Sequence, residues 1–226
     1  MDYQKILIEI EEEIRPLLGE GKVADYIPAL AQVDAKQFAI SITLNDGTHY
    51  SAGLADKLFS IQSISKVFTF TMALKIYRDT LYERLGVEPS GSAFNSIVQL
   101  EYEQGKPRNP FINAGAINIT DALINFYGDR EKTFAAIISY IRELTDDSSI
   151  KSNKIIADSE MQNGFRNLSL ANIMKSFNNL DNSVDEVVKT YFEHCSIEMN
   201  TKALSRAMLY LAHDGTDPIN NKKYIT

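Results

Sequence analysis

The sequence predicts an α+β fold, in which a small antiparallel sheet packs with a larger helical subdomain. Residues 38–53, FAISITLNDGTHYSAG, alternate apolar with small or polar residues around Asn45, Asp46 and Gly47. Those three residue types tolerate positive φ, so the segment is typical of a β-hairpin. Mostly helical patterns follow it. Strands followed by a run of helices favour an α+β arrangement over a doubly wound parallel sheet.

The helical patterns can be placed in order along the chain. Residues 3–18 carry apolar side chains at loose helical spacing with glutamates on the other face, which predicts a surface helix that ends at Gly19 and Gly21. The segment after Ser63 is apolar around most of its surface, and this predicts a buried helix. Further helices are expected at 121–127 with Thr120 as its cap, 133–144, 170–178 with Ser169 as its cap, 184–194 with a capping box of Ser183 and Glu186, and 202–212.

Composition and charge narrow the function classes. The chain has 226 residues, 44% of them hydrophobic, which suits one large domain or two interleaved subdomains with a sizeable core. Its formal net charge of −7 argues against nucleic-acid and acidic-membrane partners, because both require a basic surface.

The cysteine content and the N-terminal segment predict a cytoplasmic protein. Cys195 is the only cysteine, so no intrachain disulfide can form and a reducing compartment is expected. The acidic, amphipathic start MDYQKILIEIEEEIRPLL does not resemble a signal peptide. No stretch approaches the roughly 20 apolar residues that span a bilayer.

The segment FSIQSISKVF, residues 59–68, contains Ser63 and Lys66 at the spacing Ser-x-x-Lys. A serine hydroxyl needs a neighbouring base to act as a nucleophile, and a lysine one helical turn later lies on the same face. Because the following helix is apolar, desolvation should lower the pKa of Lys66 and make its amine a base near neutral pH. The alternative is a capping serine beside a lysine whose head group reaches solvent.

The other candidate sites are weaker. A second Ser-x-x-Lys, at residues 148–151, lies in a polar stretch with no buried helix behind it. His49, His194 and His213 lack metal-ligand spacing, and the sequence contains neither a phosphate-binding glycine loop nor an HExxH motif. Cys195 falls on an apolar helix face, which predicts a buried structural thiol.

A set of motifs gives the sequence a resemblance to a known family. GKVADYIPALA, FSIQSISKVF, EPSGSAFNS, NPFINAGAI, SE with FRN shortly after, and YFEHCSIEM occur in the order seen in the glutaminases with a serine β-lactamase-like fold. The resemblance runs from about residue 21 to the end of the chain. It implies a serine β-lactamase or penicillin-binding-protein-like architecture, formed by residues 1–226 as a single glutaminase domain.

The resemblance also implies the site residues. Ser63 matches the nucleophile of the family, and Lys66 matches its general base. The matched substrate contacts are Tyr26, Asn113, Glu160, Asn167 and Tyr191, the last of them a tyrosine at the active site.

Those residue types suit free L-glutamine. A carboxylate such as Glu160 compensates the α-ammonium group, and asparagine or tyrosine donates to the α-carboxylate. Simpler interpretations exist for each position: Asn113 as a turn residue, Glu160 on a solvated face, Asn167 before the Ser169 cap, and Tyr191 as core packing.

The sequence departs from the family pattern at its end. In the family the chain continues beyond NKKYIT with another active-site tyrosine and a Lys-Ser-Gly-Val strand, and neither occurs here. The sequence therefore predicts a C-terminally shortened glutaminase in which the late strands are missing. We expect such a chain to have strongly reduced activity at best, and an exposed sheet edge that pairs with another subunit or associates.

The resulting expectation is an amidohydrolase that converts L-glutamine to L-glutamate and ammonia, needs no metal or organic cofactor, and forms a homo-oligomer (dimer or tetramer). Two alternatives remain. A penicillin-recognising serine hydrolase shares the Ser-x-x-Lys spacing, but the sequence lacks Ser-Asp-Asn and Lys-Thr-Gly triplets. A non-catalytic remnant would bind an amino acid, or partner a full-length subunit, without turnover.

Overall fold

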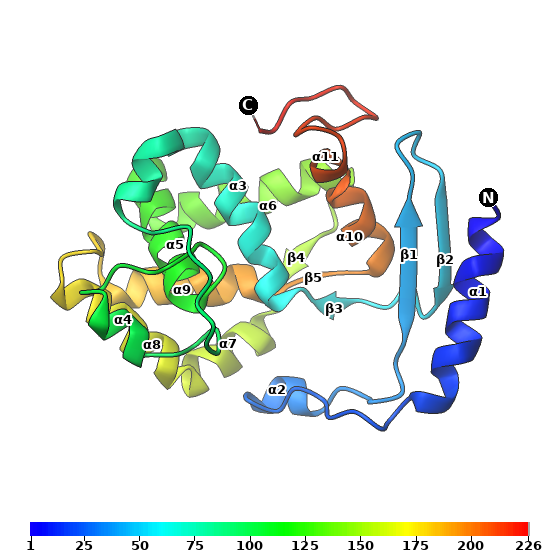
Figure 1. Ribbon diagram of the computed structural model, residues 1–226, viewed down its shortest axis with the longest axis horizontal. Coiled ribbons are helices and arrows are strands. Elements are labelled where there is room, and N and C mark those ends of the chain that lie inside the picture. Colours follow the sequence, from blue (N-terminus) through cyan, green and yellow to red (C-terminus); the bar gives the residue numbers. More distant parts are fainter. Residues whose placement is uncertain (226) are drawn as a thin grey trace. The chain divides into compact units, whose positions relative to one another are not determined.

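The predicted hairpin forms as two antiparallel strands, β1 (Ala39–Thr43) and β2 (His49–Gly53) (Figure 1). The turn between them is closed by the backbone N–H of Leu44, which donates to the carbonyl of Thr48 at 2.9 Å. Gly47 lies at φ +86°, a left-handed conformation that its missing Cβ allows. The hairpin prediction is confirmed.

The structure is a computed structural model that describes residues 1–225, and its contacts divide the chain into two compact units. The first unit comprises residues 1–60, 141–151 and the chain from 198 onward, and the second comprises residues 61–140 and 152–197. Each unit is therefore formed from segments that are far apart in sequence.

The first unit is built around the hairpin. Helix α1 (Tyr3–Ile14) packs against β2, and α10 (Thr201–Ala207) packs against β1 (Figure 1). A hydroxyl pair, Ser41 Oγ and Thr201 Oγ1 at 2.7 Å, joins β1 to α10. Three short helices complete this unit: η1 (Arg15–Leu17), α2 (Pro28–Ala31) and α11 (Leu209–Ala212). A second sheet has the strand order β3 (Phe59–Ser60), β5 (Ile197–Met199) and β4 (Lys151–Ser152), and β3 pairs with β5 antiparallel.

The second unit is helical. Its centre is α5 (Asn113–Tyr127), which packs against α3 (Ser65–Tyr77), α8 (Phe165–Ser176) and α9 (Val184–Cys195). Every residue of α5 from Ala114 to Ile124 is buried, so tertiary packing, more than intrinsic helix propensity, stabilises this helix. The remaining helices are η2 (Gln62–Ile64), η3 (Arg78–Glu83), α4 (Val98–Tyr102), α7 (Lys154–Asn163) and most of α6 (Arg130–Thr145).

Helix positions agree with the sequence analysis where a local signal marks an end. Ser183 is the N-cap of α9, as predicted: its side chain accepts from the Glu186 N–H at 3.2 Å and donates to the Glu186 carboxylate at 2.8 Å. The long buried helix after Ser63 is also confirmed, as α3.

Two predicted caps are wrong. Thr120 lies in the middle of α5, where its hydroxyl donates to the Ala116 carbonyl at 2.8 Å. Ser169 lies inside α8 and donates to the Phe165 carbonyl at 2.9 Å. A hydroxyl within a helix can satisfy itself on the carbonyl four residues earlier, so a threonine or serine alone does not mark a start. The expected helix at 202–212 is likewise divided in two, with Met208 between α10 and α11.

None of the helices in the described part of the chain is both long enough and apolar enough to cross a membrane.

Candidate active site

Ser63 lies at the surface in the short helix η2, which leads directly into α3. The residue before it, Gln62, has φ +45°, a region that costs a non-glycine residue about 1–2 kcal/mol. The chain is anchored just before this point, where the Ile61 N–H donates to the Ile197 carbonyl at 2.9 Å. Packing therefore maintains a strained turn immediately before Ser63, as is common at functional sites.

Lys66 lies one turn into the helical segment and is 1% exposed. Its Nζ donates to Asn113 Oδ1 at 2.7 Å and to the Phe111 carbonyl at 3.1 Å. The ring of Phe94 lies beneath it, with its centroid 5.0 Å from Nζ. Burial penalises the ammonium form and lowers the pKa of Lys66 from 10.5 to about 8.

Asn113 connects Lys66 to a third predicted site residue. It is the first residue of α5, and its Nδ2 donates to Asn167 Oδ1, in α8, at 2.9 Å. Its backbone N–H donates to the Phe94 carbonyl at 2.8 Å. Lys66, Asn113 and Asn167 thus form one hydrogen-bonded row, whereas no hydrogen bond joins Ser63 to Lys66 among the described residues.

A tight loop holds Asn113 in place. Asn109 Oδ1 accepts from the backbone N–H of Phe111 at 2.9 Å and of Ile112 at 3.1 Å, which orders the turn before α5. Gly115, one turn into the helix, allows that loop to approach closely: a Cβ there would lie 1.9 Å from the Asn109 carbonyl oxygen. The segment NPFINAGAI therefore needs glycine at this position.

Replacement of Gly115 tests that packing. Gly115→Ala should lower the free energy of unfolding by about 1–3 kcal/mol or more, because the added methyl group meets backbone atoms that cannot rotate away. Gly21→Ala is the matched control, since nothing lies within 4 Å of its added Cβ. Urea unfolding of both variants measures the effect, and equal stability would show that the loop is free to move.

Glu160 and Tyr191 lie close to Cys195. Glu160, in α7, and Tyr191, in α9, are each 3% exposed. The pKa of the Cys195 thiol is raised to about 12, chiefly by burial; the hydrogen bond with Ser65 and the charge of Lys66 oppose this rise, and smaller effects come from the charge of Glu160, which raises the pKa, and a hydrogen bond with Tyr191, which lowers it. The interpretation of Glu160 as a residue of a solvated face is wrong. Cys195 is buried and unpaired, as the sequence analysis predicted.

Tyr26 belongs to the first unit, just before α2, and its side chain is 58% exposed. Its role as a substrate contact stays a prediction. All the other matched residues lie in the second unit: Ser63, Lys66, Asn113, Glu160, Asn167 and Tyr191.

Two residues that shape this site were not predicted from the sequence. Phe111 supplies its carbonyl to Lys66, and Phe94 supplies its ring. Both contacts join segments far apart in sequence, so no local pattern indicates them. The ordering role of Asn109 had a local signal, because asparagine commonly bonds to backbone N–H groups two and three residues later.

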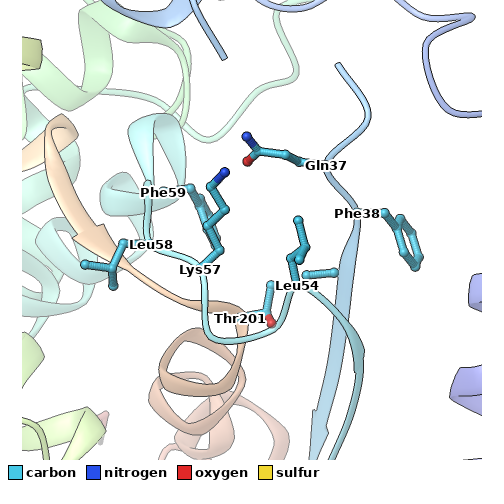
Figure 2. Close-up of a pocket in the computed structure, with 8 residues that line it drawn as sticks. Gln37, Phe38, Leu54, Lys57, Leu58, Phe59 and Thr201 are labelled. Carbon is cyan, nitrogen blue, oxygen red and sulfur yellow. The ribbon is translucent and has the colours of Figure 1, made fainter. Parts of the chain in front are cut away.

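Metal-ligand clusters and pockets bear on other kinds of site. The described residues contain no cluster of three or more histidine, cysteine or acidic side chains that could hold a metal ion. A pocket of about 280 Å³ lies in the first unit, where Figure 2 shows Gln37, Leu54, Lys57 and Phe59 at its wall. None of the matched site residues lines this pocket.

Comparison with known proteins decides the family. A family model described as glutaminase matches residues 21–226. The chain belongs to the glutaminase family.

Curated glutaminases resemble this chain over its whole length. The glutaminase of Aliarcobacter butzleri (strain RM4018) is 53% identical over 226 residues, which cover 100% of this chain and 73% of that protein. The glutaminase of Rhizobium meliloti (strain 1021) is 49% identical over 225 residues, which cover 100% of this chain and 71% of that protein. This chain is thus shorter than the glutaminases it matches.

Solved glutaminase structures share the fold. A Bacillus glutaminase in the presence of 4.3 M NaCl matches with a TM-score of 0.88 and 31% identity, covering 99% of this chain and 71% of that one. A probable glutaminase from Bacillus subtilis, complexed with 6-diazo-5-oxo-L-norleucine, matches with a TM-score of 0.87 and 30% identity, covering 100% of this chain and 69% of that one. The predicted α+β, serine β-lactamase-like fold is confirmed. A glutaminase is therefore favoured over the penicillin-recognising alternative.

Proposed function

We propose that this glutaminase hydrolyses L-glutamine to L-glutamate and ammonia through a γ-glutamyl ester on Ser63. The observation that carries the proposal is the buried Lys66 and its row of partners, one helical turn after an exposed serine on a strained turn. Family membership supports the reaction, and this row supports the assignment of roles.

The hydrogen bonds of Lys66 suit a base. A neutral amine has two N–H donors and one lone pair. Asn113 Oδ1 and the Phe111 carbonyl take up the two donors, which leaves the lone pair for a proton from Ser63. A pKa of about 8 keeps a useful fraction of the amine neutral near physiological pH.

The reaction then proceeds in two steps. Ser63 Oγ attacks the side-chain amide carbon as Lys66 takes its proton, and a tetrahedral oxyanion forms. The C–N bond breaks, and ammonia leaves after protonation, with help from the Tyr191 hydroxyl. A water molecule next attacks the ester, and L-glutamate is released as Ser63 regains its proton.

The asparagines are oriented for the substrate carboxylate. Lys66 fixes the direction of the Asn113 amide, because an ammonium or amine N–H can only point at the amide oxygen. Asn113 Nδ2 then fixes Asn167, whose oxygen faces Asn113 and whose nitrogen is turned away from it. That nitrogen is the donor that we assign to the α-carboxylate of glutamine.

Glu160 is assigned to the α-ammonium group. Glu160→Gln should weaken glutamine binding by about 1.5–3 kcal/mol, the value of a hydrogen bond to a charged group. The loss should be much smaller for an analogue that lacks the α-amino group. Isothermal titration with both ligands measures the difference, and equal losses would show that Glu160 does not contact the ammonium. Asp158→Asn, an exposed member of a Lys154 ion pair on the same helix, is the control and should leave binding unchanged.

One experiment separates the enzyme from the non-catalytic alternative. Ammonia release from glutamine is measured on this chain, together with covalent labelling by 6-diazo-5-oxo-L-norleucine and peptide mass spectrometry. The proposal expects ammonia and a label on Ser63. Glutamine binding with neither turnover nor label would favour the amino-acid-binding remnant.

We also propose that the enzyme is cytoplasmic, because its single cysteine suits a reducing compartment, and that it is homo-oligomeric, as the family resemblance implies. Light scattering of the purified chain tests the oligomer, and a mass that stays monomeric over a wide concentration range would contradict it.

A further inference from the structure

A single buried imidazole links three of the helices that carry proposed active-site residues, α3, α5 and α9. His194, in the last turn of α9, is 0% exposed. Its Nδ1 lies 2.8 Å from Ser65 Oγ of α3, and its Nε2 lies 3.2 Å from Thr120 Oγ1 of α5. Ser65 and Thr120 are also 0% exposed, so no solvent competes for these bonds.

The hydrogen bonds determine which nitrogen carries the proton. Thr120 has one hydroxyl hydrogen, and it donates that hydrogen to the Ala116 carbonyl at 2.8 Å. The Thr120 oxygen can then only accept from His194, so Nε2 must carry the hydrogen. Nδ1 is left as an acceptor, and Ser65 donates to it.

Cys195, next to His194, continues this series of hydrogen bonds toward Tyr191. Ser65 Oγ lies 3.7 Å from Cys195 Sγ, and Cys195 is in turn hydrogen-bonded to Tyr191. Ser65 has a single hydroxyl hydrogen, so it can donate to only one of His194 Nδ1 and Cys195 Sγ at a time, and the 2.8 Å contact with Nδ1 is the shorter of the two. The ring of Tyr191 also meets that of His194 edge-to-face, with centroids 5.2 Å apart at 87°.

The imidazole stays uncharged. Burial and the nearby Lys66 lower the pKa of His194 to about 3, so it remains neutral wherever the enzyme is folded under physiological conditions. A neutral ring with both nitrogens bonded has one preferred orientation, since a ring flip would turn carbon atoms toward the Ser65 and Thr120 hydroxyls and break both hydrogen bonds.

We propose that His194 is a positioning residue for glutamine hydrolysis: as the Nε2–H tautomer it joins Ser65 to Thr120, and so holds Lys66 and Tyr191 in register. Lys66 directly follows Ser65 in α3, and Tyr191 lies one turn before His194 in α9. The proposal rests on the function proposed above, but its tautomer can be tested without turnover.

Nuclear magnetic resonance tests the tautomer. Long-range ¹H–¹⁵N spectra of histidine-labelled protein, with His194 assigned by its loss in His194→Gln, should show a protonated Nε2 and an unprotonated Nδ1. These signals should not change between about pH 8 and 5, while an exposed histidine titrates near 6.5. An Nδ1–H tautomer, or titration in that range, would overturn the proposal.

Substitution of Thr120 tests the positioning role. Thr120→Val keeps the shape but leaves Nε2–H without an acceptor, so the ring must move or change tautomer. We expect kcat to fall by about 10–100-fold with little change in KM, because small displacements of reacting groups are this costly. Thr120→Ser keeps the hydroxyl and should restore most of kcat. Equal values for the valine and serine variants would contradict the role.

Thr133→Val is the matched control. Thr133, in α6, is also 0% exposed. Its hydroxyl likewise donates to the carbonyl four residues earlier, that of Asp129, at 2.6 Å. Loss of that hydroxyl should leave kcat unchanged. If Thr133→Val lowered kcat as much as Thr120→Val, general destabilisation would explain both.

A readout that needs no turnover separates this proposal from the proposed function. The ¹³Cε signal of Lys66 reports its titration, and Thr120→Val should shift that titration whereas Thr120→Ser should not. A chain that releases no ammonia but shows this shift would contradict the proposed function and support the role of His194. Identical Lys66 titration in all variants would overturn the role.

Discussion

Ser63→Ala should lower kcat for glutamine by at least about 10³-fold, because loss of an activated nucleophile removes the covalent route altogether. The fold should persist, since Ser63 lies at the surface and the change removes one hydroxyl group. Ammonia release and thermal unfolding measure the two effects.

Ser148→Ala provides the control for that prediction. Ser148 has the same spacing to a lysine, but it is exposed and lies in the first unit, outside any helix. Its replacement should change neither activity nor stability. Normal turnover by Ser63→Ala would exclude the proposed mechanism.

Lys66→Met should lower kcat by about 10²–10⁴-fold, the usual contribution of a general base. In the unaltered enzyme, kcat/KM should rise with pH and level off above about 8, where the amine of Lys66 is neutral. If kcat/KM instead levelled off or passed through a maximum governed by a group with a pKa near 6, another residue would be the base. Lys75→Met, an exposed position on the same helix, should leave the profile unchanged.

The same pKa predicts how stability depends on pH. The pKa of Lys66 is lowered in the folded state, so between about pH 8 and 10.5 the unfolded chain binds more protons than the folded chain. Stability contributed by this group therefore increases as pH rises through that window. Relative to Lys66→Met, the unaltered protein should gain about 2–3 kcal/mol of unfolding free energy from pH 7 to 10. Denaturant titrations at several pH values test this, and a constant difference would mean that Lys66 titrates normally.

Local patterns in the sequence predicted the elements whose ends depend on nearby residues. The hairpin turn needs Gly47 at positive φ, and the start of α9 needs the reciprocal bonds of Ser183 and Glu186. These interactions span three or four residues, so they are visible in a short window. Ser63 and Lys66 are close for the same reason.

Other elements could not be predicted in this way. Helix α5 begins at Asn113, eight residues before the expected start at 121, and its first turns contain asparagine and glycine, which are weak helix formers. Its N-cap residue, Ile112, makes no side-chain cap, so burial against α3, α8 and α9 supplies the stability. Helix α7, which carries Glu160, was also missed, although the Asn153 side chain caps it and was a usable signal.

The sequence by itself determined the family, the hairpin, the buried helix after Ser63 and the identity of the candidate catalytic pair, because each depends on residue type and spacing. Only the tertiary structure decided the chemical state of that pair. Burial in the folded chain lowers the pKa of Lys66, and the two acceptors that orient its amine, Asn113 and Phe111, lie more than 40 positions along the chain. The tautomer of His194 depends in the same way on Ser65 and Thr120. Protonation states depend on burial and on contacts between residues that are distant in sequence. The spacing of residues along the chain does not specify those contacts.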